Sequence, residues 1–200
     1  MKNVKPITIL ELAQLAKRAG EIFESQKIRY QLTGGVVASY YGEQRSTQDV
    51  DIVIDMQGIE PKSRDMLFRV LSQSFMVSRT AFDEAFANKS MFQILDLETM
   101  LRADIYVGGI LPGRFERTTI SEIAPGYFLP TVCVEDAILS KLVWINMGSG
   151  RSKQDVVRIL QNKPEMDTQY LETTAEELGV KHILDELKTL AESNDPNIIF

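Results

Sequence analysis

The chain has 200 residues, of which 44% are hydrophobic and 25% charged, and this composition excludes a disordered protein. Its formal net charge is −6, which argues against a general nucleic-acid coating protein because phosphate binding relies on clustered Lys and Arg. A run of about 18 apolar residues is lacking, so we expect no membrane-spanning helix and no membrane partner.

The predicted elements of the first half of the chain are strands mixed with helices. In chain order they are a helix over 8–26, a short strand over 28–35 that ends in a turn, a short helix over 36–42, a strand over 49–55, a helix over 61–73, and strands over 74–79, 91–98 and 102–107. Segment 108–131 is rich in turn signals, at Gly108, Pro112 and Pro125, and is expected to form loops.

From Val134 to about Ser193 the pattern is helical, in three or four pieces broken near Gly148, Pro164 and Gly179. Strands mixed with helices, followed by helices alone, predict an α/β (α+β) fold: a mixed sheet flanked by helices. We therefore expect a core over 1–133, including the N-terminal helix, and a C-terminal helical portion over 134–200 packed on that core.

His182 and Cys133 are the only histidine and the only cysteine. A single histidine argues against a His-rich zinc site and against a Ser-His-Asp triad. A lone cysteine forms no intramolecular disulfide, and the first 20 residues show no signal peptide, so we expect a cytoplasmic location. Any metal ion must then be held by carboxylates, which favours Mg²⁺ or Mn²⁺.

Asp49 and Asp51 lie on one face of the predicted strand over 49–55. Residues two apart in a strand point the same way, and a rise of about 3.3 Å per residue places these two about 7 Å apart. Two like charges on a half-buried strand repel each other unless a cation lies between them, and two divalent ions about 4 Å apart form a phosphoryl-transfer site. The alternative is that both carboxylates face solvent on an edge strand or cap the next turn.

Asp104 supplies a third carboxylate, in the middle of a predicted strand where β-propensity disfavours aspartate. Arg102, Asp104 and Tyr106 share one face of that strand, and the opposite face is apolar. Asp96 is the competitor, but it lies near a strand end, where a role in a turn is less costly. The sequence favours Asp104.

Gly34 and Gly35 stand between a predicted strand and a predicted helix. Such a pair lets the backbone approach a phosphate closely, with the amides of the helix N-terminus directed at it. A Gly-Gly pair alone is more often just a tight turn. Its position ahead of the strand that bears two aspartates makes it a candidate phosphate site.

The pattern "LTGG…R-S-T-x-D-V-D" with a later "ADIYV" resembles the nucleotidyltransferase superfamily that includes DNA polymerase beta. Within it, the chain is most similar to the bacterial AbiEii-type nucleotidyltransferases, toxins of type IV toxin–antitoxin systems, over about residues 28–162. The resemblance implies that triphosphate binds at Gly34 and Gly35, and that Arg45 contacts phosphate. It also implies that two Mg²⁺ (or Mn²⁺) ions are held by Asp49, Asp51 and Asp104.

The chain departs from the family pattern next to the glycines, where a Ser or Thr usually contacts the phosphates. Val36 follows Gly35 here, and the nearest hydroxyls belong to Thr33 and Ser39.

Lys141 lies in an apolar stripe of the predicted helix that begins at Val134. An ammonium in such a stripe is costly unless it meets an anion. Either the lysine extends its head into water, or it reaches a nucleotide site where triphosphate or an aspartate neutralises it. Asp155, on the next helix, has the alternative of pairing with Arg151 on a solvated face. The AbiEii-like family has a lysine and then an aspartate in this order, which implies nucleotide or catalytic contact for Lys141 and activation of the acceptor for Asp155.

These features predict a metal-dependent enzyme that moves a nucleoside monophosphate from a nucleoside triphosphate to a hydroxyl of an acceptor. RNA, protein and small-molecule acceptors stay open, and the toxin interpretation adds a cognate antitoxin as a partner. The alternatives on the same fold are a module that binds nucleotide without transferring it and a module for protein interaction.

Overall fold

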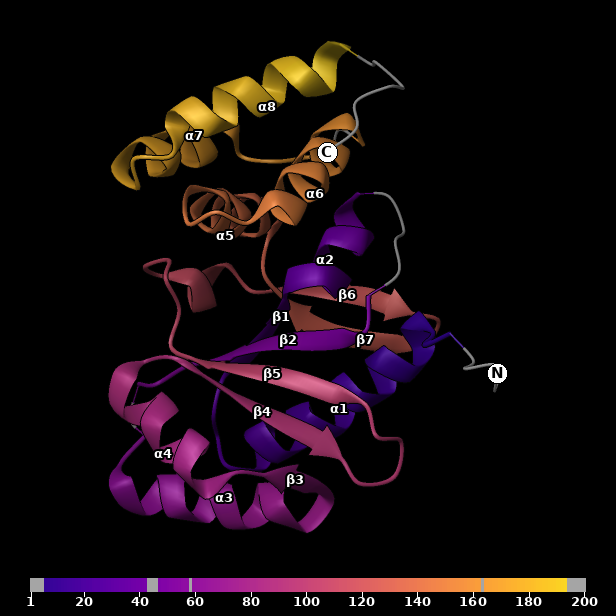
Figure 1. Ribbon diagram of the computed structural model, residues 1–200, viewed down its shortest axis with the longest axis vertical. Helices are drawn as coiled ribbons and strands as arrows, with labels where there is room; N and C mark the ends of the chain where they lie inside the picture. The colour runs from indigo at the N-terminus through magenta and orange to yellow at the C-terminus, as the bar shows by residue number, and fades with distance from the viewer. Residues whose placement is uncertain (1–5, 43–46, 58, 163, 194–200) are drawn as a thin grey trace. The chain divides into compact units, whose positions relative to one another are not determined.

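The computed structural model describes residues 6–42, 47–57, 59–162 and 164–193 (Figure 1). Contacts divide the chain into two units: unit 1 comprises residues 1–36 and 46–131, and unit 2 comprises residues 37–45 and 132–200. The boundary between residues 133 and 134 stays a prediction. Among the described residues, no helix has the length and apolar character needed to cross a membrane.

Unit 1 is built on a mixed seven-stranded sheet in the order β3-β4-β5-β2-β1-β7-β6. The strands are β1 (Tyr30–Thr33), β2 (Asp49–Ile54), β3 (Phe75–Val77), β4 (Met91–Asp96), β5 (Arg102–Val107), β6 (Thr119–Ala124) and β7 (Tyr127–Thr131). The pairs β2–β5 and β1–β7 are parallel, and the other four pairs are antiparallel. The predicted mixed sheet flanked by helices is confirmed.

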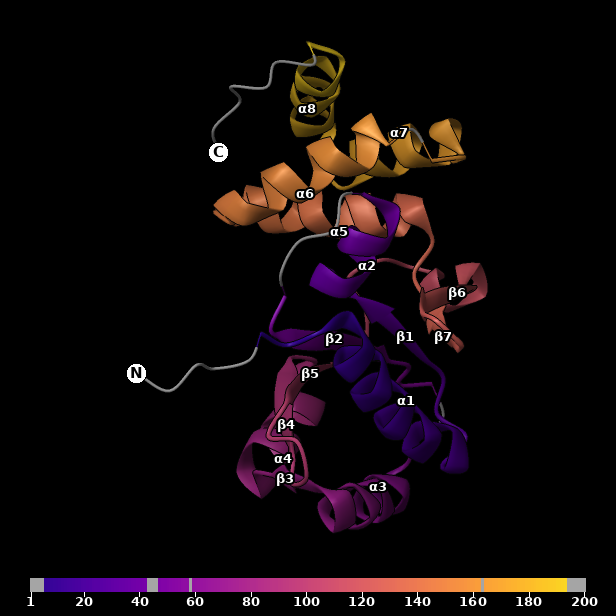
Figure 2. The same ribbon diagram turned by 90° about the vertical axis from the view of Figure 1, so that its right-hand side faces the viewer.

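Three helices of unit 1, α1 (Ile9–Ser25), α3 (Pro61–Ser74) and α4 (Arg79–Asn88), cover one face of this sheet (Figures 1 and 2). Thr8 and Glu11 form a capping box that fixes the start of α1, close to the predicted position. The sequence predicted a strand up to residue 79 and no element over 80–88, where α4 packs Phe82 against Phe92 of β4 at a ring distance of 4.9 Å. Beneath these helices, Ile52 and Ile105 are fully buried.

The prediction of loops over 108–131 is wrong in its second half. A short 3-10 helix, η1 (Arg114–Arg117), is followed by the hairpin of β6 and β7. The turn signal at Pro125 marks the tip of this hairpin, where Gly126 has φ +79. Ile123 and Leu129 are buried on strands that contact α1, so packing against the helix decides the structure of a segment with little local pattern.

Unit 2 is helical, and its helix breaks lie where the sequence predicts them. Its helices are α5 (Val134–Asn146), α6 (Gly150–Gln161), α7 (Thr168–Glu177) and α8 (Lys181–Ser193). The helix α2 (Gly34–Tyr41) starts in unit 1 and ends in unit 2. There the Tyr41 hydroxyl donates to the carbonyl of Val132 at 3.0 Å, and the Tyr41 carbonyl accepts from the Asn162 side chain at 2.8 Å.

Candidate active site

The three predicted aspartates of unit 1 lie on the sheet face opposite α1, α3 and α4, which we call the open face. Asp51 of β2 is directly opposite Asp104 of β5 in the parallel ladder, and Asp49 is opposite Arg102. Residues opposite each other in a ladder point to the same side of the sheet. The alternation predicted for β2 is confirmed, because Val50, Ile52 and Ile54 are fully buried on the other face.

Asp51 lies against the glycine pair. Gly34 follows β1 directly and has φ +66, a left-handed conformation that favours glycine. A Cβ added at Gly34 would lie 1.8 Å from Asp51 Oδ2, so a side chain at position 34 would displace this carboxylate. The backbone N–H of Gly35 donates to the same oxygen at 3.3 Å. The glycines form the first turn of α2, whereas the sequence placed them before the helix.

Each of the three carboxylates is held by a neighbour on β4 or β5. The Gln93 side-chain amide donates to Asp104 Oδ1 at 2.8 Å, and the Tyr106 hydroxyl donates to Asp51 Oδ1 at 3.4 Å. Arg102 Nη2 lies 3.4 Å from Asp49 Oδ2. Sequence reasoning missed Gln93 and the role of Tyr106. Only the register of β4, β5 and β2 shows that these side chains meet the carboxylates.

Tyr106 reports the electrostatic environment of the site. Burial raises the pKa of its hydroxyl, and the charges of Asp51 and Asp104, the hydrogen bond to Asp51 and the charge of Asp49 raise it further. All three aspartates therefore act on one hydroxyl. Tyr106 stays protonated at neutral pH and remains a hydrogen-bond donor to Asp51.

The donor set of the open face suits a hard divalent cation, because it offers three carboxylates from two adjacent strands. Within the described residues, however, no three His, Cys, Asp or Glu side chains come together closely enough to hold a metal ion. Asp104 is bonded to Gln93 and Asp49 pairs with Arg102 in this arrangement. Metal ligation by Asp49, Asp51 and Asp104 stays a prediction, and Arg45 lies outside the described residues.

Asp96, the competitor of Asp104, lies on the covered face of the sheet. It is 1% exposed, in the same alternating set as Phe92 and Ile94. Nη1 and Nη2 of Arg18 each lie 3.0 Å from one of its carboxylate oxygens, and the Thr99 hydroxyl donates to it at 2.6 Å. Its carboxylate also accepts from the Glu98 N–H, so Asp96 stands at the start of a turn, the less costly role that the sequence offered for it. The ion pair to α1 is a structural role that the sequence did not indicate.

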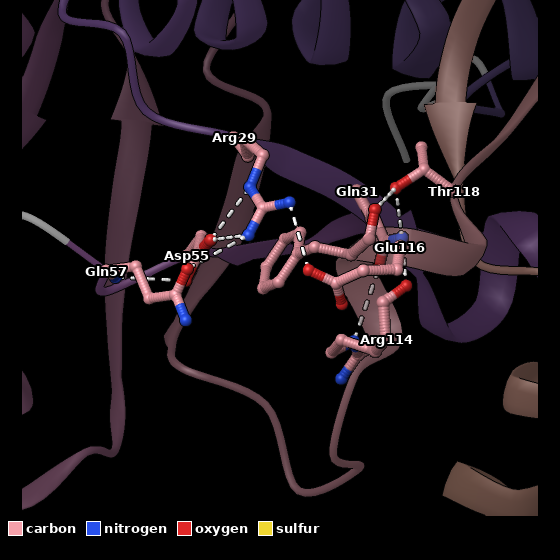
Figure 3. Close-up of polar contacts among 8 residues, drawn as sticks. Arg29, Gln31, Asp55, Gln57, Arg114, Glu116 and Thr118 are labelled. Atoms are coloured by element: carbon pink, nitrogen blue, oxygen red, sulfur yellow. Dashed lines mark hydrogen bonds and ion pairs between the residues drawn. The ribbon is translucent and has the colours of Figure 1, made fainter.

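A second polar cluster lies at the opposite end of β1 and β2 (Figure 3). Arg29 Nε donates to Asp55 at 2.9 Å, and its Nη1 donates to Glu116 at 3.2 Å. The fully buried Gln31 amide donates to the Arg114 carbonyl at 2.8 Å and to the Thr118 hydroxyl at 2.6 Å. Of this cluster, Arg29, Asp55, Arg114 and Glu116 line a cavity of about 240 Å³. Because they bond to one another, we assign the cluster to anchoring the segment around η1.

In unit 2, Lys141 and Asp155 form a buried ion pair between α5 and α6. Lys141 Nζ lies 2.6 Å from Asp155 Oδ2, and the two side chains are 10% and 4% exposed. The alternative in which the Lys141 ammonium extends into water is therefore wrong, and so is the alternative that places Asp155 on a solvated face. An aspartate neutralises the lysine, which agrees with that part of the second alternative in the sequence analysis. Contact of either residue with nucleotide or acceptor stays a prediction.

We expect Gly34→Ala to reduce both stability and any activity that depends on Asp51. The left-handed conformation costs about 1–2 kcal/mol for a residue with a Cβ, and the methyl group must also displace the Asp51 carboxylate. Gly126→Ala is the matched control, because Gly126 has φ +79 and no atom within 4 Å of the added Cβ. Urea unfolding should show the larger loss for Gly34→Ala. Equal losses in the two variants would contradict the contact with Asp51.

Comparisons with known proteins bear on the fold. No protein-family model matches the sequence, and no curated protein matches it. Among solved structures, the chain is similar to an antigenic nucleotidyltransferase-like protein from Paracoccidioides brasiliensis, with 17% identity, a TM-score of 0.54, and coverage of 92% of this chain and 95% of that chain.

Two further structures match at lower TM-scores. A lincosamide antibiotic adenylyltransferase with lincomycin bound matches with 17% identity and a TM-score of 0.47, over 78% of this chain and 98% of its own. The nucleotidyltransferase toxin MenT4 of Mycobacterium tuberculosis H37Rv matches with 14% identity and a TM-score of 0.44, over 82% of this chain and 62% of its own. On the strength of the likeness to the Paracoccidioides protein, the chain has a nucleotidyltransferase-like fold.

Proposed function

We propose that the chain is a metal-dependent nucleotidyltransferase, which moves a nucleoside monophosphate from a nucleoside triphosphate to an acceptor hydroxyl. The contact of Gly34 and Gly35 with Asp51, beside Asp104 in register on the next strand, carries this proposal. It places a glycine turn at a helix N-terminus next to a pair of carboxylates. The first feature suits a phosphate and the second a divalent cation.

In this proposal each residue of unit 1 has a definite task. Gly34 and Gly35 seat the triphosphate with the backbone at the start of α2. Asp49, Asp51 and Asp104 hold two Mg²⁺ or Mn²⁺ ions, which when bound stabilise charge on the phosphates and the leaving pyrophosphate. Tyr106 and Gln93 orient Asp51 and Asp104 through the bonds at 3.4 and 2.8 Å.

The remaining assignments rest on the sequence motif. Arg45 and Lys141 offset phosphate charge, and Asp155 takes the proton of the acceptor hydroxyl. An AbiEii-type toxin with a cognate antitoxin is the finer form of the proposal. A cytoplasmic location is part of it.

A nucleotide-binding module without transfer is the second candidate, and Val36 favours it. This side chain is 2% exposed and stands where the family pattern has a phosphate-binding hydroxyl. Weaker contacts to the phosphates would lower the rate of transfer more than the affinity for nucleotide, because catalysis requires the reacting atoms to be held in line.

The test is transfer of label from each α-³²P nucleoside triphosphate, with Mg²⁺, to total RNA, to soluble protein or to small molecules. We expect label in one of these fractions, and we expect EDTA to remove it. Magnesium-dependent binding of nucleotide without any label would select the binding module. If nucleotide binding and label transfer are both absent, both candidates are contradicted.

A further inference from the structure

The open face continues from the aspartates onto β4 and β3, where apolar side chains lie on both sides of Gln93. Leu95 of β4 is opposite Arg102 of β5, and Met91 is opposite Tyr106. Met76 of β3 is in turn opposite Leu95. We call Met76, Met91 and Leu95 the methionine floor. It begins one strand away from Asp104, on the same side of the sheet.

The methionine floor is exposed although it consists of apolar side chains. Met76 is 59% exposed, Met91 is 40% exposed and Leu95 is partly exposed. The helices that contact β3 and β4 lie on the other face, where Phe92 and Ile94 are buried. Exposed apolar patches rimmed by polar residues mark ligand or partner sites in many proteins. Methionine is suited to such a surface because its side chain adapts to different shapes.

Apart from the metal ions of the proposed function, this part of the open face offers little positive charge for a second polyanion. On the paired segments of β3, β4, β5 and β2, the charged residues that point to the open face are Asp49, Asp51, Asp104 and Arg102. Arg102 is the only cation among these open-face residues, and its Nη2 lies 3.4 Å from Asp49 Oδ2. An RNA acceptor would bring a row of phosphates to this surface, and phosphates need clustered Lys or Arg.

The size of the methionine floor suits a small molecule. From Leu95 to Met91 is four residues along one strand, or about 13 Å, and Met76 adds about 5 Å across to the neighbouring strand. A specific protein–protein interface covers about 800 Å² on each partner, which is far more than the methionine floor provides.

We infer that the methionine floor binds the acceptor of the transfer, and that this acceptor is a small molecule without phosphate groups, carrying its hydroxyl beside an apolar ring or chain. This inference rests on the proposed function. In the step it serves, a bond forms between the acceptor oxygen and the α-phosphorus. The bond from the α-phosphorus to the bridging oxygen breaks, pyrophosphate leaves with the electron pair, and the hydroxyl proton passes to a carboxylate base.

Methyl NMR tests the inference without any need for transfer. The full chain labelled with [methyl-¹³C]methionine would be titrated with 3-phenylpropan-1-ol and, separately, with its phosphate ester. We expect the Met76 and Met91 methyl signals to shift with the alcohol and not with the ester. Met66 and Met147, which are 49% and 70% exposed, serve as reference methyls that should not respond.

Two variants distinguish specific binding at the methionine floor from nonspecific binding of the alcohol. Leu95→Ser should weaken binding of the alcohol about tenfold, because it removes the apolar contact that one leucine side chain would make with the bound alcohol. Met76→Ser, at a more exposed position, keeps the test valid if Leu95→Ser does not fold. Ile120→Ser is the control, since Ile120 is 65% exposed on β6 and lies outside the methionine floor.

Equal shifts at all four methyls, tighter binding of the ester, or unchanged affinity in both variants of the methionine floor would overturn the inference. Transfer of label to RNA or to protein would also overturn it, while leaving the proposed function intact. Failure of the proposed function has a separate signature, which is the absence of label from every acceptor fraction.

Discussion

Asp51→Asn should abolish nucleotidyl transfer, by about 10³-fold or more, while the free energy of unfolding stays unchanged or rises. Asp51 is opposite Asp104 and shares its strand face with Asp49, so the substitution removes repulsion between like charges. The amide keeps the shape of the carboxylate. Its one oxygen can accept the bond from the Gly35 N–H, and its NH2 group can donate to the Tyr106 hydroxyl oxygen. Activity is lost because an amide oxygen neutralises no charge on a metal ion.

The measurement is single-turnover transfer of ³²P label, together with urea unfolding of the same preparations. Asp96→Asn is the matched control, because its carboxylate lies on the covered face and pairs with Arg18. We expect this variant to lose stability and to retain the transfer rate of its folded fraction. A fully active Asp51→Asn variant would refute the proposed metal mechanism.

Lys141→Met should lower the free energy of unfolding of the chain by about 3–5 kcal/mol. The substitution leaves the Asp155 carboxylate, which is 4% exposed, without the ammonium that lies 2.6 Å from it. A buried charge that loses its partner carries the desolvation penalty of an ion. Urea unfolding followed by circular dichroism measures the loss, provided that the slope with denaturant is unchanged.

The double variant Lys141→Met, Asp155→Leu separates structure from chemistry. Replacing both charges by apolar groups should restore most of the stability, because neither ion then has to be desolvated. If Lys141 contacts nucleotide, the restored protein should still fail to transfer it. A stable and fully active double variant would show that the pair serves folding alone.

The alternation of side chains along β2 and β5 was predictable from the sequence. Apolar residues at every second position identify the covered face, so the aspartates between them fall on the open face. Asp104 and Asp96 illustrate the same rule across strands. They lie on opposite faces because one belongs to the polar set of β5 and the other to the buried set of β4. Sequence reasoning preferred Asp104 for a different reason, its place in mid-strand.

Contacts between distant segments could not be predicted in this way. The partner of Lys141 lies 14 residues away on another helix, and the apolar stripe alone left its environment open. The hairpin of β6 and β7 contains Pro130 and ends in a Pro125–Gly126 turn, so local signals predicted loops where packing on α1 forms strands. The start of α2 at Gly34 was missed because glycine is a poor helix former. Its close contact with Asp51 is visible only in three dimensions.

In the sheet of unit 1, odd and even positions along a strand are under different selection, one set for stability and the other for the outward face. In β2 and β5, one set of alternate positions holds the chain together under the helices, and the other set faces outward with carboxylates, Arg102 and Tyr106. Under the proposed function, a change of acceptor can therefore arise through outward positions of β3 and β4 such as 76, 91 and 95 without first requiring a more stable core. The same geometry implies that substitution of the outward carboxylates can leave protein abundance unchanged, so a descendant of this chain without them would persist as a well-folded protein.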